Sequence, residues 1–133
     1  MSKRAVLTDK APRPLGVFNQ AIVANGFVFC SGQTAQDPAT RTLIPGDIQA
    51  HTHQCIRNMS AVLEAAGSSL DQVLEVNVFL ADMKDFAKMN EIYVQYWGDV
   101  KPARTCVAVK TLPGNTDVEM KCIGLVRGAS SKL

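Results

Sequence analysis

The sequence predicts an α+β fold in which one mixed β-sheet carries two helices on one of its faces. The chain has 133 residues, which is the length of a single domain. Hydrophobic residues make up 47% and charged residues 20% of the chain, the proportions of an ordinary globular protein. Segments with strand-like patterns outnumber two segments with helical periodicity. The predicted order is β-β-α-β-α-β-β in one domain, 1–133, with no internal repeat and no linker.

The first predicted strands form a hairpin. Residues 1–20 have the character of a loop, and Ala21–Ala24 and Phe27–Ser31 are short apolar segments that follow it. Asn25-Gly26 joins the two segments, and this dipeptide is the strongest short signal for a tight hairpin turn. A polar loop over residues 32–46 comes next.

Two segments have the apolar period of a helix. From Ile48 to Ala66, apolar or small residues recur every three or four positions, with Asp47 as the expected N-cap and Gly67 as the expected end. A second helix is predicted over Met83–Trp97, where four residues share one stripe: Phe86, Asn90, Tyr93 and Trp97.

Three further strands are predicted at Val73–Leu80, Arg104–Val109 and Val118–Val126, because β-branched and other apolar residues dominate them. Helices on one face leave the other face of the sheet uncovered. Since apolar residues alternate on both faces of these strands, we expect the second face to be buried as well. The expected cover is another copy of the same chain.

Composition argues against several classes of function. The net charge is +2 and the basic residues are scattered, so no cationic stripe for nucleic acid is apparent. No apolar run reaches the ~20 residues of a membrane span, and the N-terminal residues carry no secretion signal. We therefore expect a soluble, non-secreted protein without a membrane or nucleic-acid partner. Four scattered cysteines and no C-x-x-C favour reduced, mostly buried thiols.

The two histidines do not predict a metal centre. His51 and His53 would point to different faces of a helix, and only Cys55 aligns with His51 at i, i+4. Two ligands do not make a zinc site, so we expect no metal and interpret both histidines as solvated residues on a helix face.

Two small groups of residues are candidates for chemistry. Alternation along a strand places Arg104 and Cys106 on one face and Thr105 and Val107 on the other. The Arg104 guanidinium suits a carboxylate ligand through two parallel hydrogen bonds, although these residues taken alone favour a structural salt bridge. Glu119, on another strand, either compensates an internal charge or serves as a base.

Several short segments occur in a characteristic order: Gly16–Ile22, Ser31–Gln33, Gly46–Ile48, Asn77–Asp82, Asp85-Phe86, Asn90–Tyr93, Pro102–Arg104 and Asp117–Met120. Together they resemble the RidA family of enamine/imine deaminases, also called YjgF or L-PSP, over about residues 12–126. The resemblance implies a chorismate-mutase-like α+β fold and a homotrimer whose sheets face one another, with three clefts between subunits. It leaves residues 127–133 as a flexible tail.

The resemblance also implies an activity and a set of site residues. The activity is hydrolysis of 2-imino acids to 2-keto acids and ammonia, without a cofactor. Arg104 would hold the substrate carboxylate and Glu119 would orient or activate water, while further residues line the cleft: Ser31, Gly32, Asn90 and Cys106. Phe18 stands where the family commonly has tyrosine, so a phenolic hydroxyl is missing.

Two other functions remain open from the sequence, an endoribonuclease or translation inhibitor and a non-catalytic trimer that binds small carboxylates or unfolded chains. The chain ends in Ser131-Lys132-Leu133, which is the address read by the peroxisomal import receptor. It predicts a protein of the peroxisomal matrix, with the cytoplasm as the alternative if the tripeptide is only a frayed terminus.

Overall fold

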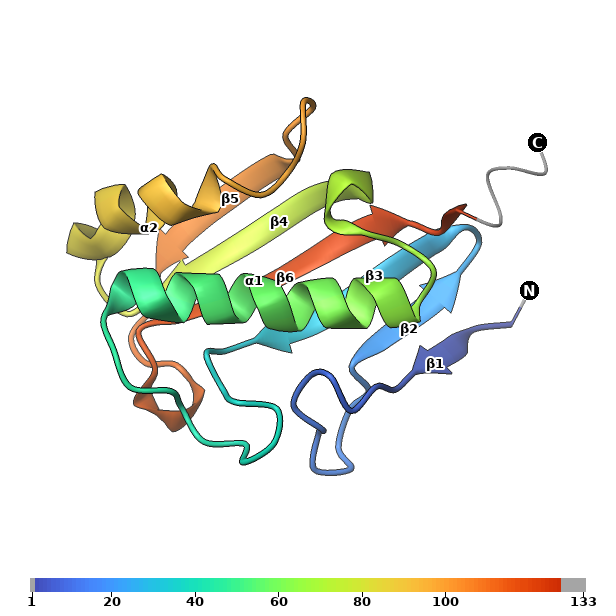
Figure 1. The fold of residues 1–133 in the computed structure, drawn as a ribbon, viewed down its shortest axis with the longest axis horizontal. Helices are drawn as coiled ribbons and strands as arrows, with labels where there is room; N and C mark the ends of the chain where they lie inside the picture. Colours follow the sequence, from blue (N-terminus) through green and yellow to red (C-terminus); the bar gives the residue numbers. More distant parts are fainter. Residues whose placement is uncertain (1, 128–133) are drawn as a thin grey trace.

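The computed structural model describes residues 2–127 and confirms the predicted fold class. Figure 1 shows one sheet, with helix α1 (Ile48–Ala65) lying across it and helix α2 (Phe86–Tyr93) on the same face. Within residues 2–127, neither helix is long and apolar enough to cross a membrane. Of the predicted tail, only Arg127 belongs to the described residues; 128–133 lie outside them, including the C-terminal tripeptide.

The sheet has six strands in the order β1-β2-β3-β6-β4-β5. All neighbouring strands are antiparallel except β4 and β5, which run parallel. The parallel pair is joined through α2, as a crossover connection requires. The strands are β1 (Arg4–Val6), β2 (Ala21–Ala24), β3 (Phe27–Gln33), β4 (Val73–Leu80), β5 (Ala103–Ala108) and β6 (Val118–Leu125).

Helix α1 begins and ends as the sequence predicts. The carboxylate of Asp47 accepts a hydrogen bond from the backbone N–H of Ala50 at 3.0 Å, and Gly67 follows the helix with φ +88°. A left-handed residue at this place satisfies the last carbonyl groups of a helix, and glycine adopts that conformation without steric cost.

Two predictions about secondary structure are wrong. The N-terminal segment is not all loop, because β1 (Arg4–Val6) pairs with β2 at the edge of the sheet; three residues are too few to show a period. The second helix is also shorter than Met83–Trp97. A 3₁₀ turn, η2 (Met83–Asp85), precedes it, and α2 ends at Tyr93. Trp97 lies in the irregular turn that follows α2, and its side chain is buried in the core. Two more 3₁₀ turns are η1 (Leu70–Gln72) and η3 (Pro113–Asn115).

The core lies between the sheet and the two helices. Side chains of α1 such as Ile56, Met59 and Leu63 are fully buried against strand residues of the central strands, including Val78 and Met120. Three of the four cysteines are buried and Cys106 is partly exposed, and all four are free thiols, as predicted.

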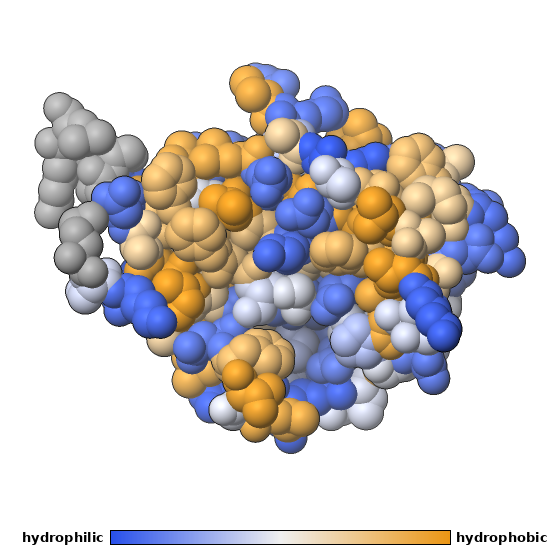
Figure 2. Space-filling model, turned by 180° about the vertical axis from the view of Figure 1, so that it is seen from behind, coloured by the Kyte–Doolittle hydropathy of each residue, from blue (hydrophilic) through white to orange (hydrophobic). Residues whose placement is uncertain are grey.

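The other face of the sheet has no helix on it, as the strand pattern predicts. Phe29 and Val107 point to this face and are 45% and 41% exposed, and the Phe27 ring packs beside Phe29. Figure 2 shows this side of the molecule, where apolar areas alternate with hydrophilic ones. An apolar sheet face left open in one chain is a candidate interface.

Candidate active site

The first part of the site is built around Arg104 on the edge strand β5. Arg104 pairs with Val76 and Cys106 pairs with Val78, both of which are buried under the helices, so Arg104 and Cys106 share the helix-covered face as predicted. Thr105 consequently points to the uncovered face, since side chains alternate along a strand. At the sheet edge, α2 covers Arg104 only partly.

Helix α2 holds the Arg104 guanidinium through one stripe of residues. Nη1 donates a hydrogen bond to Oδ1 of Asn90 at 2.7 Å. The guanidinium carbon lies 4.6 Å from the ring centre of Tyr93 and 5.5 Å from that of Phe86, which is the geometry of a cation–π contact. These residues are spaced by four and three positions, so they follow one another along one side of the helix. Three of the four residues of the predicted stripe are therefore confirmed on α2, and all three contact Arg104, whereas Trp97 lies beyond the end of the helix.

Arg104 makes no ion pair with any of residues 2–127. The structural salt bridge that the sequence allowed is thus absent from the described part of one chain. A half-buried guanidinium fixed by neutral groups keeps its full charge and several N–H donors for a ligand. A carboxylate is the ligand that matches this planar fork.

The neighbours of Arg104 remain neutral. Burial raises the pKa of Tyr93 to about 12, against a smaller opposing effect of the Arg104 charge. Burial also raises the pKa of the Cys106 thiol, again opposed by Arg104. Because a thiol reacts as a nucleophile only when it is deprotonated, Cys106 is a neutral lining group beside Arg104 and not an activated nucleophile.

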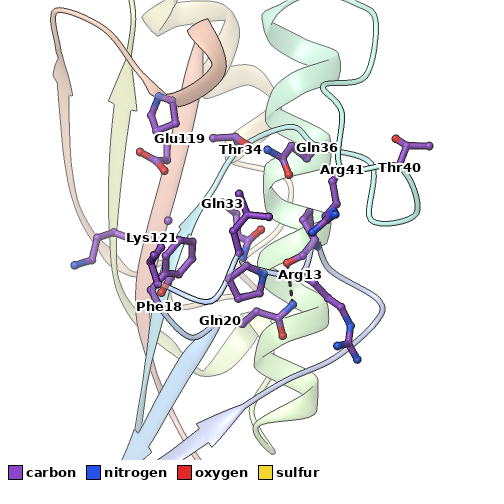
Figure 3. Close-up of a pocket in the computed structure, with 17 residues that line it drawn as sticks. Arg13, Phe18, Gln20, Gln33, Thr34, Gln36, Thr40, Arg41, Glu119 and Lys121 are labelled. Atoms are coloured by element: carbon purple, nitrogen blue, oxygen red, sulfur yellow. Dashed lines mark hydrogen bonds between the residues drawn. The ribbon is translucent and has the colours of Figure 1, made fainter.

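The second part of the site is a cavity of about 710 Å³ that contains Glu119. Glu119 lies near the start of β6 and points away from helix α1 (Figure 3). Phe18, Ser31 and Gly32, which the family resemblance places in the cleft, also line this cavity. The Ser31 hydroxyl donates to the backbone oxygen of Asn19 at 2.6 Å, which ties β3 to the segment that carries Phe18.

The Glu119 side chain occupies the space that a side chain at position 32 would need. A Cβ at position 32 would lie 2.6 Å from Oε2 of Glu119, which is closer than van der Waals contact permits. The backbone at Gly32 therefore approaches the Glu119 carboxylate closely. Burial raises the pKa of Glu119, because removal from water disfavours the charged carboxylate. A carboxyl group with a raised pKa both accepts and returns protons more readily near neutral pH.

Two buried amides hold the loops around the cavity. The Gln20 side chain donates to the backbone oxygens of Thr8, Ala11 and Pro12 and accepts from the backbone N–H of Thr8. The Asn58 side chain, from helix α1, donates to the backbone oxygens of Thr34 and Gln36 at 3.1 and 2.9 Å. Amides with several partners leave these loops little freedom.

Arg104 and Glu119 do not meet within one chain. Arg104 lies on the helix-covered face, whereas Glu119 pairs with Phe79 on the uncovered face. Asn90 and Cys106 accompany Arg104, and the cavity residues accompany Glu119. One chain therefore carries two candidate half-sites, one on each face of the sheet.

The interpretation of the histidines as solvated is wrong. The His51 side chain is only 12% exposed, and its ring bridges Oδ1 of Asp117 at 2.7 Å and the backbone oxygen of Ile44 at 2.9 Å. The ring is therefore held between a carboxylate oxygen and a backbone oxygen. His53 contacts the hydroxyl of Tyr96. Within residues 2–127, no three His, Cys, Asp or Glu side chains gather in a way that could hold a metal ion.

Sequence reasoning missed the basic residues of the cavity. Arg13, Arg41 and Lys121 all line it, on three separate segments. Arg13 and Arg41 lie in loops without a periodic pattern, so no local signal shows which way their side chains point. Lys121 could have been found, because it follows Glu119 by two positions in a strand and therefore faces the same side.

In a comparison with known proteins, residues 8–126 of the chain match the family model described as Endoribonuclease L-PSP. The chain is 46% identical over 123 residues to a RutC family protein of Pyrococcus abyssi, covering 92% of this chain and 97% of the relative. RidA of the Antarctic bacterium Psychrobacter has a similar structure, with a TM-score of 0.88, 39% identity and coverage of 92% and 99%. E. coli TdcF, solved with bound serine, has a TM-score of 0.87, 32% identity and coverage of 92% and 98%.

The peroxisomal prediction is wrong. Relatives from Schizosaccharomyces pombe and Saccharomyces cerevisiae, 44% and 42% identical to this chain, are named as mitochondrial proteins. A C-terminal tripeptide is short enough to occur by chance, and Ser131-Lys132-Leu133 lies outside the described residues. The tripeptide alone therefore does not support a peroxisomal location when these relatives are named as mitochondrial.

Proposed function

Because this chain belongs to the Endoribonuclease L-PSP family, which includes proteins named RidA, we propose that it hydrolyses 2-imino acids to 2-keto acids and ammonia. The observation that carries the proposal is the Arg104 guanidinium. It is fixed by Asn90 and two aromatic rings and has no ion-pair partner among the described residues, which suits the carboxylate of a small acid. TdcF, a similar protein, was solved with serine, itself a small amino acid with a carboxylate.

Water provides the oxygen in this reaction. Glu119 takes a proton from water as the water oxygen bonds to the electrophilic imine carbon, and the C=N double bond becomes a single bond. Glu119 passes this proton to the imine nitrogen, which gives a neutral carbinolamine. Glu119 then takes the hydroxyl proton of the carbinolamine and delivers it to the amino nitrogen, so that the C–N bond breaks, ammonia leaves and C=O forms. The raised pKa of Glu119 suits a group that alternates between base and acid. The cycle consumes one water and leaves Glu119 unchanged, and it uses no cofactor.

The active site combines half-sites from two copies of the chain. Arg104 at the β5 edge of one copy reaches the Glu119 cavity of its neighbour, and the uncovered apolar faces pack together. A cyclic homotrimer brings the halves together three times, with the same contact at each interface. The apolar residues on the open face, including Phe29 and Val107, support this assembly.

Phe18 adapts the site rather than abolishing it. It lines the cavity beside Glu119 and is 55% exposed in one chain, so a ligand or a second copy can cover it. The aromatic surface remains, and only a hydroxyl donor is missing relative to the family pattern. Water activation in this mechanism depends on Glu119 and not on that hydroxyl.

Ribonuclease activity has less support from the described residues. The cavity has one lining carboxylate and no lining histidine, whereas RNA cleavage uses paired acid and base groups. The family description nevertheless names an endoribonuclease, so the decisive assay measures both activities. Purified protein is added to a threonine dehydratase that generates 2-iminobutanoate, and release of 2-ketobutyrate and loss of a labelled RNA are followed in parallel. Faster ketoacid release without RNA loss is expected; RNA loss without acceleration would overturn the proposal.

A further inference from the structure

The end of the cavity opposite Glu119 carries a cation that the proposed hydrolysis does not use. Arg41 lines the cavity from the loop between β3 and α1. Figure 3 shows Glu119 at one side of the cavity and Arg41 at the other, with Thr34 and Gln36 between them. Two polar side chains therefore lie between the Glu119 carboxylate and the Arg41 guanidinium, in a cavity that apolar residues also line.

The guanidinium of Arg41 has neither an ion pair nor a side-chain hydrogen bond within residues 2–127. The other arginine of the cavity, Arg13, already donates from Nε to Asp9 at 2.6 Å. Glu119 is the only carboxylate among the described lining residues, and it lies at the far side. Arg41 is therefore a solvent-exposed positive charge on the lining of the cavity, without an ion pair within residues 2–127.

The loop that carries Arg41 is held in one conformation. The Arg41 backbone N–H donates to the oxygen of Asp37 at 2.7 Å, and Gln36 pairs with Leu43 across the base of the loop. Asn58 fixes the oxygen of Gln36 from helix α1. A side chain on such a loop loses little further backbone freedom when it binds a ligand.

Arg41 also occupies a strained backbone position. Its φ is +60°, in the left-handed region, which costs a residue other than glycine or asparagine roughly 1–2 kcal/mol. Glycine would fit this turn better and would present no charge to the cavity. Strain kept at a position next to a pocket is typical of residues with a functional role.

We propose that Arg41 forms a second anion subsite, which binds the side-chain carboxylate of a dicarboxylic 2-imino acid. This inference rests on the proposed function and extends it to a substrate class. Arg104 of a neighbouring copy holds the carboxylate next to the imine carbon, and Arg41 binds the carboxylate at the other end through its planar fork. The preferred substrates are 2-imino acids that carry a second, terminal carboxylate.

The test compares 2-keto acids, which are the stable products of the reaction, as ligands in calorimetry. 2-Oxoglutarate carries the second carboxylate, 2-oxohexanoate has a similar length without it, and 2-oxobutanoate is short. The wild-type protein is expected to bind 2-oxoglutarate about tenfold or more tightly than 2-oxohexanoate, the effect of one charge-assisted hydrogen-bonded pair. Equal affinities for these two acids would overturn the proposal.

Variants identify the residue responsible. Arg41→Asn keeps the left-handed turn, because asparagine tolerates φ above zero, and it is expected to abolish the preference for 2-oxoglutarate while leaving 2-oxobutanoate binding within about twofold. Arg41→Gly serves as the second variant. Arg57→Gln, on the exposed side of α1 and outside the cavity, is the matched control and should change nothing. An unchanged preference in a folded Arg41→Asn protein would also overturn the subsite.

The two proposals fail in distinguishable ways. If the wild type accelerates 2-iminobutanoate hydrolysis but shows no Arg41-dependent preference, the subsite is wrong and the deaminase stands. If the wild type accelerates no imine hydrolysis but binds 2-oxoglutarate in an Arg41-dependent manner, the subsite stands and the reaction is wrong. Loss of binding of all three acids in Arg41→Asn, with an unchanged melting temperature, would mean that Arg41 is not selective for the second carboxylate.

Discussion

Two inactive variants are expected to restore activity in one another, because Arg104 and Glu119 lie on opposite faces of the sheet and must come from different copies. Arg104→Lys keeps the charge but loses the two-pronged contact with a carboxylate, which costs about 1.5–3 kcal/mol, or roughly 10- to 150-fold in kcat/KM. Glu119→Gln removes the base and lowers turnover about 100-fold or more. Each variant alone therefore retains at most about a tenth of the wild-type activity.

Mixed trimers of the two variants contain one intact site. In a cyclic trimer with both kinds of subunit, an intact Arg104 faces an intact Glu119 at one of the three interfaces, whichever variant is in excess. Mixed trimers isolated with two different affinity tags should therefore have about one third of the wild-type activity per trimer.

The assay follows release of 2-ketobutyrate from dehydratase-generated 2-iminobutanoate, with light scattering to confirm the trimer. A mixture of separately folded homotrimers, combined without exchange, is the control and should stay at the average of the two parents. If the isolated mixed trimers do not exceed that average, Arg104 and Glu119 do not share a site between copies. A fully active Arg104→Lys homotrimer would refute the carboxylate assignment directly.

Four further variants test single residues. Glu119→Gln should raise the melting temperature at neutral pH, because the wild-type protein then holds a partly buried, ionised carboxylate. Since burial raises the pKa of Glu119, the protonated group stabilises the fold below the unfolded pKa of ~4.3, and this stabilisation is lost as pH rises through the folded pKa. The melting temperatures of the variant and the wild type should therefore converge near pH 4. Gly32→Ala should displace the Glu119 carboxylate and lower kcat more than it raises KM, measured by initial rates with the fold checked by circular dichroism. His51→Gln should lower the free energy of unfolding in urea by about 1–3 kcal/mol, because it breaks the bridge between Asp117 and Ile44. Phe18→Tyr should leave kcat within about threefold, and a larger change would show that a hydroxyl here takes part in water activation.

Periodicity predicted the side-chain directions that matter most for the first half-site. Alternation along β5 correctly placed Arg104 with Cys106, and the helical stripe correctly joined Asn90 and Tyr93. These predictions succeed because strand and helix geometry fixes side-chain direction locally. The strand pattern likewise predicted the uncovered apolar face.

Local pattern could not predict contacts that depend on tertiary structure. The sequence predicted a solvated helix face for His51 because the nearby residues do not complete a metal site, yet Asp117, 66 residues away in the sequence, contacts its ring. Arg41 was missed because its direction depends on a loop that Asn58 holds from a different element. In both cases a side chain from a distant segment decides the environment, and no window of sequence contains both partners.

The separation of Arg104 from Glu119 has the same origin but a different consequence. A sheet is a barrier between its two faces, so residues that alternate onto opposite faces cannot share a ligand within the chain, however close their strands are. β4 alone lies between β5 and β6, and yet the Arg104 side chain contacts α2 whereas Glu119 contacts Gly32. If both residues act on one imine, the reaction itself requires assembly, and the apolar uncovered face supplies the surface that makes assembly favourable. A monomeric form of this chain, for instance one with a charge introduced at Phe29, should then keep its fold and lose its turnover together with its trimer.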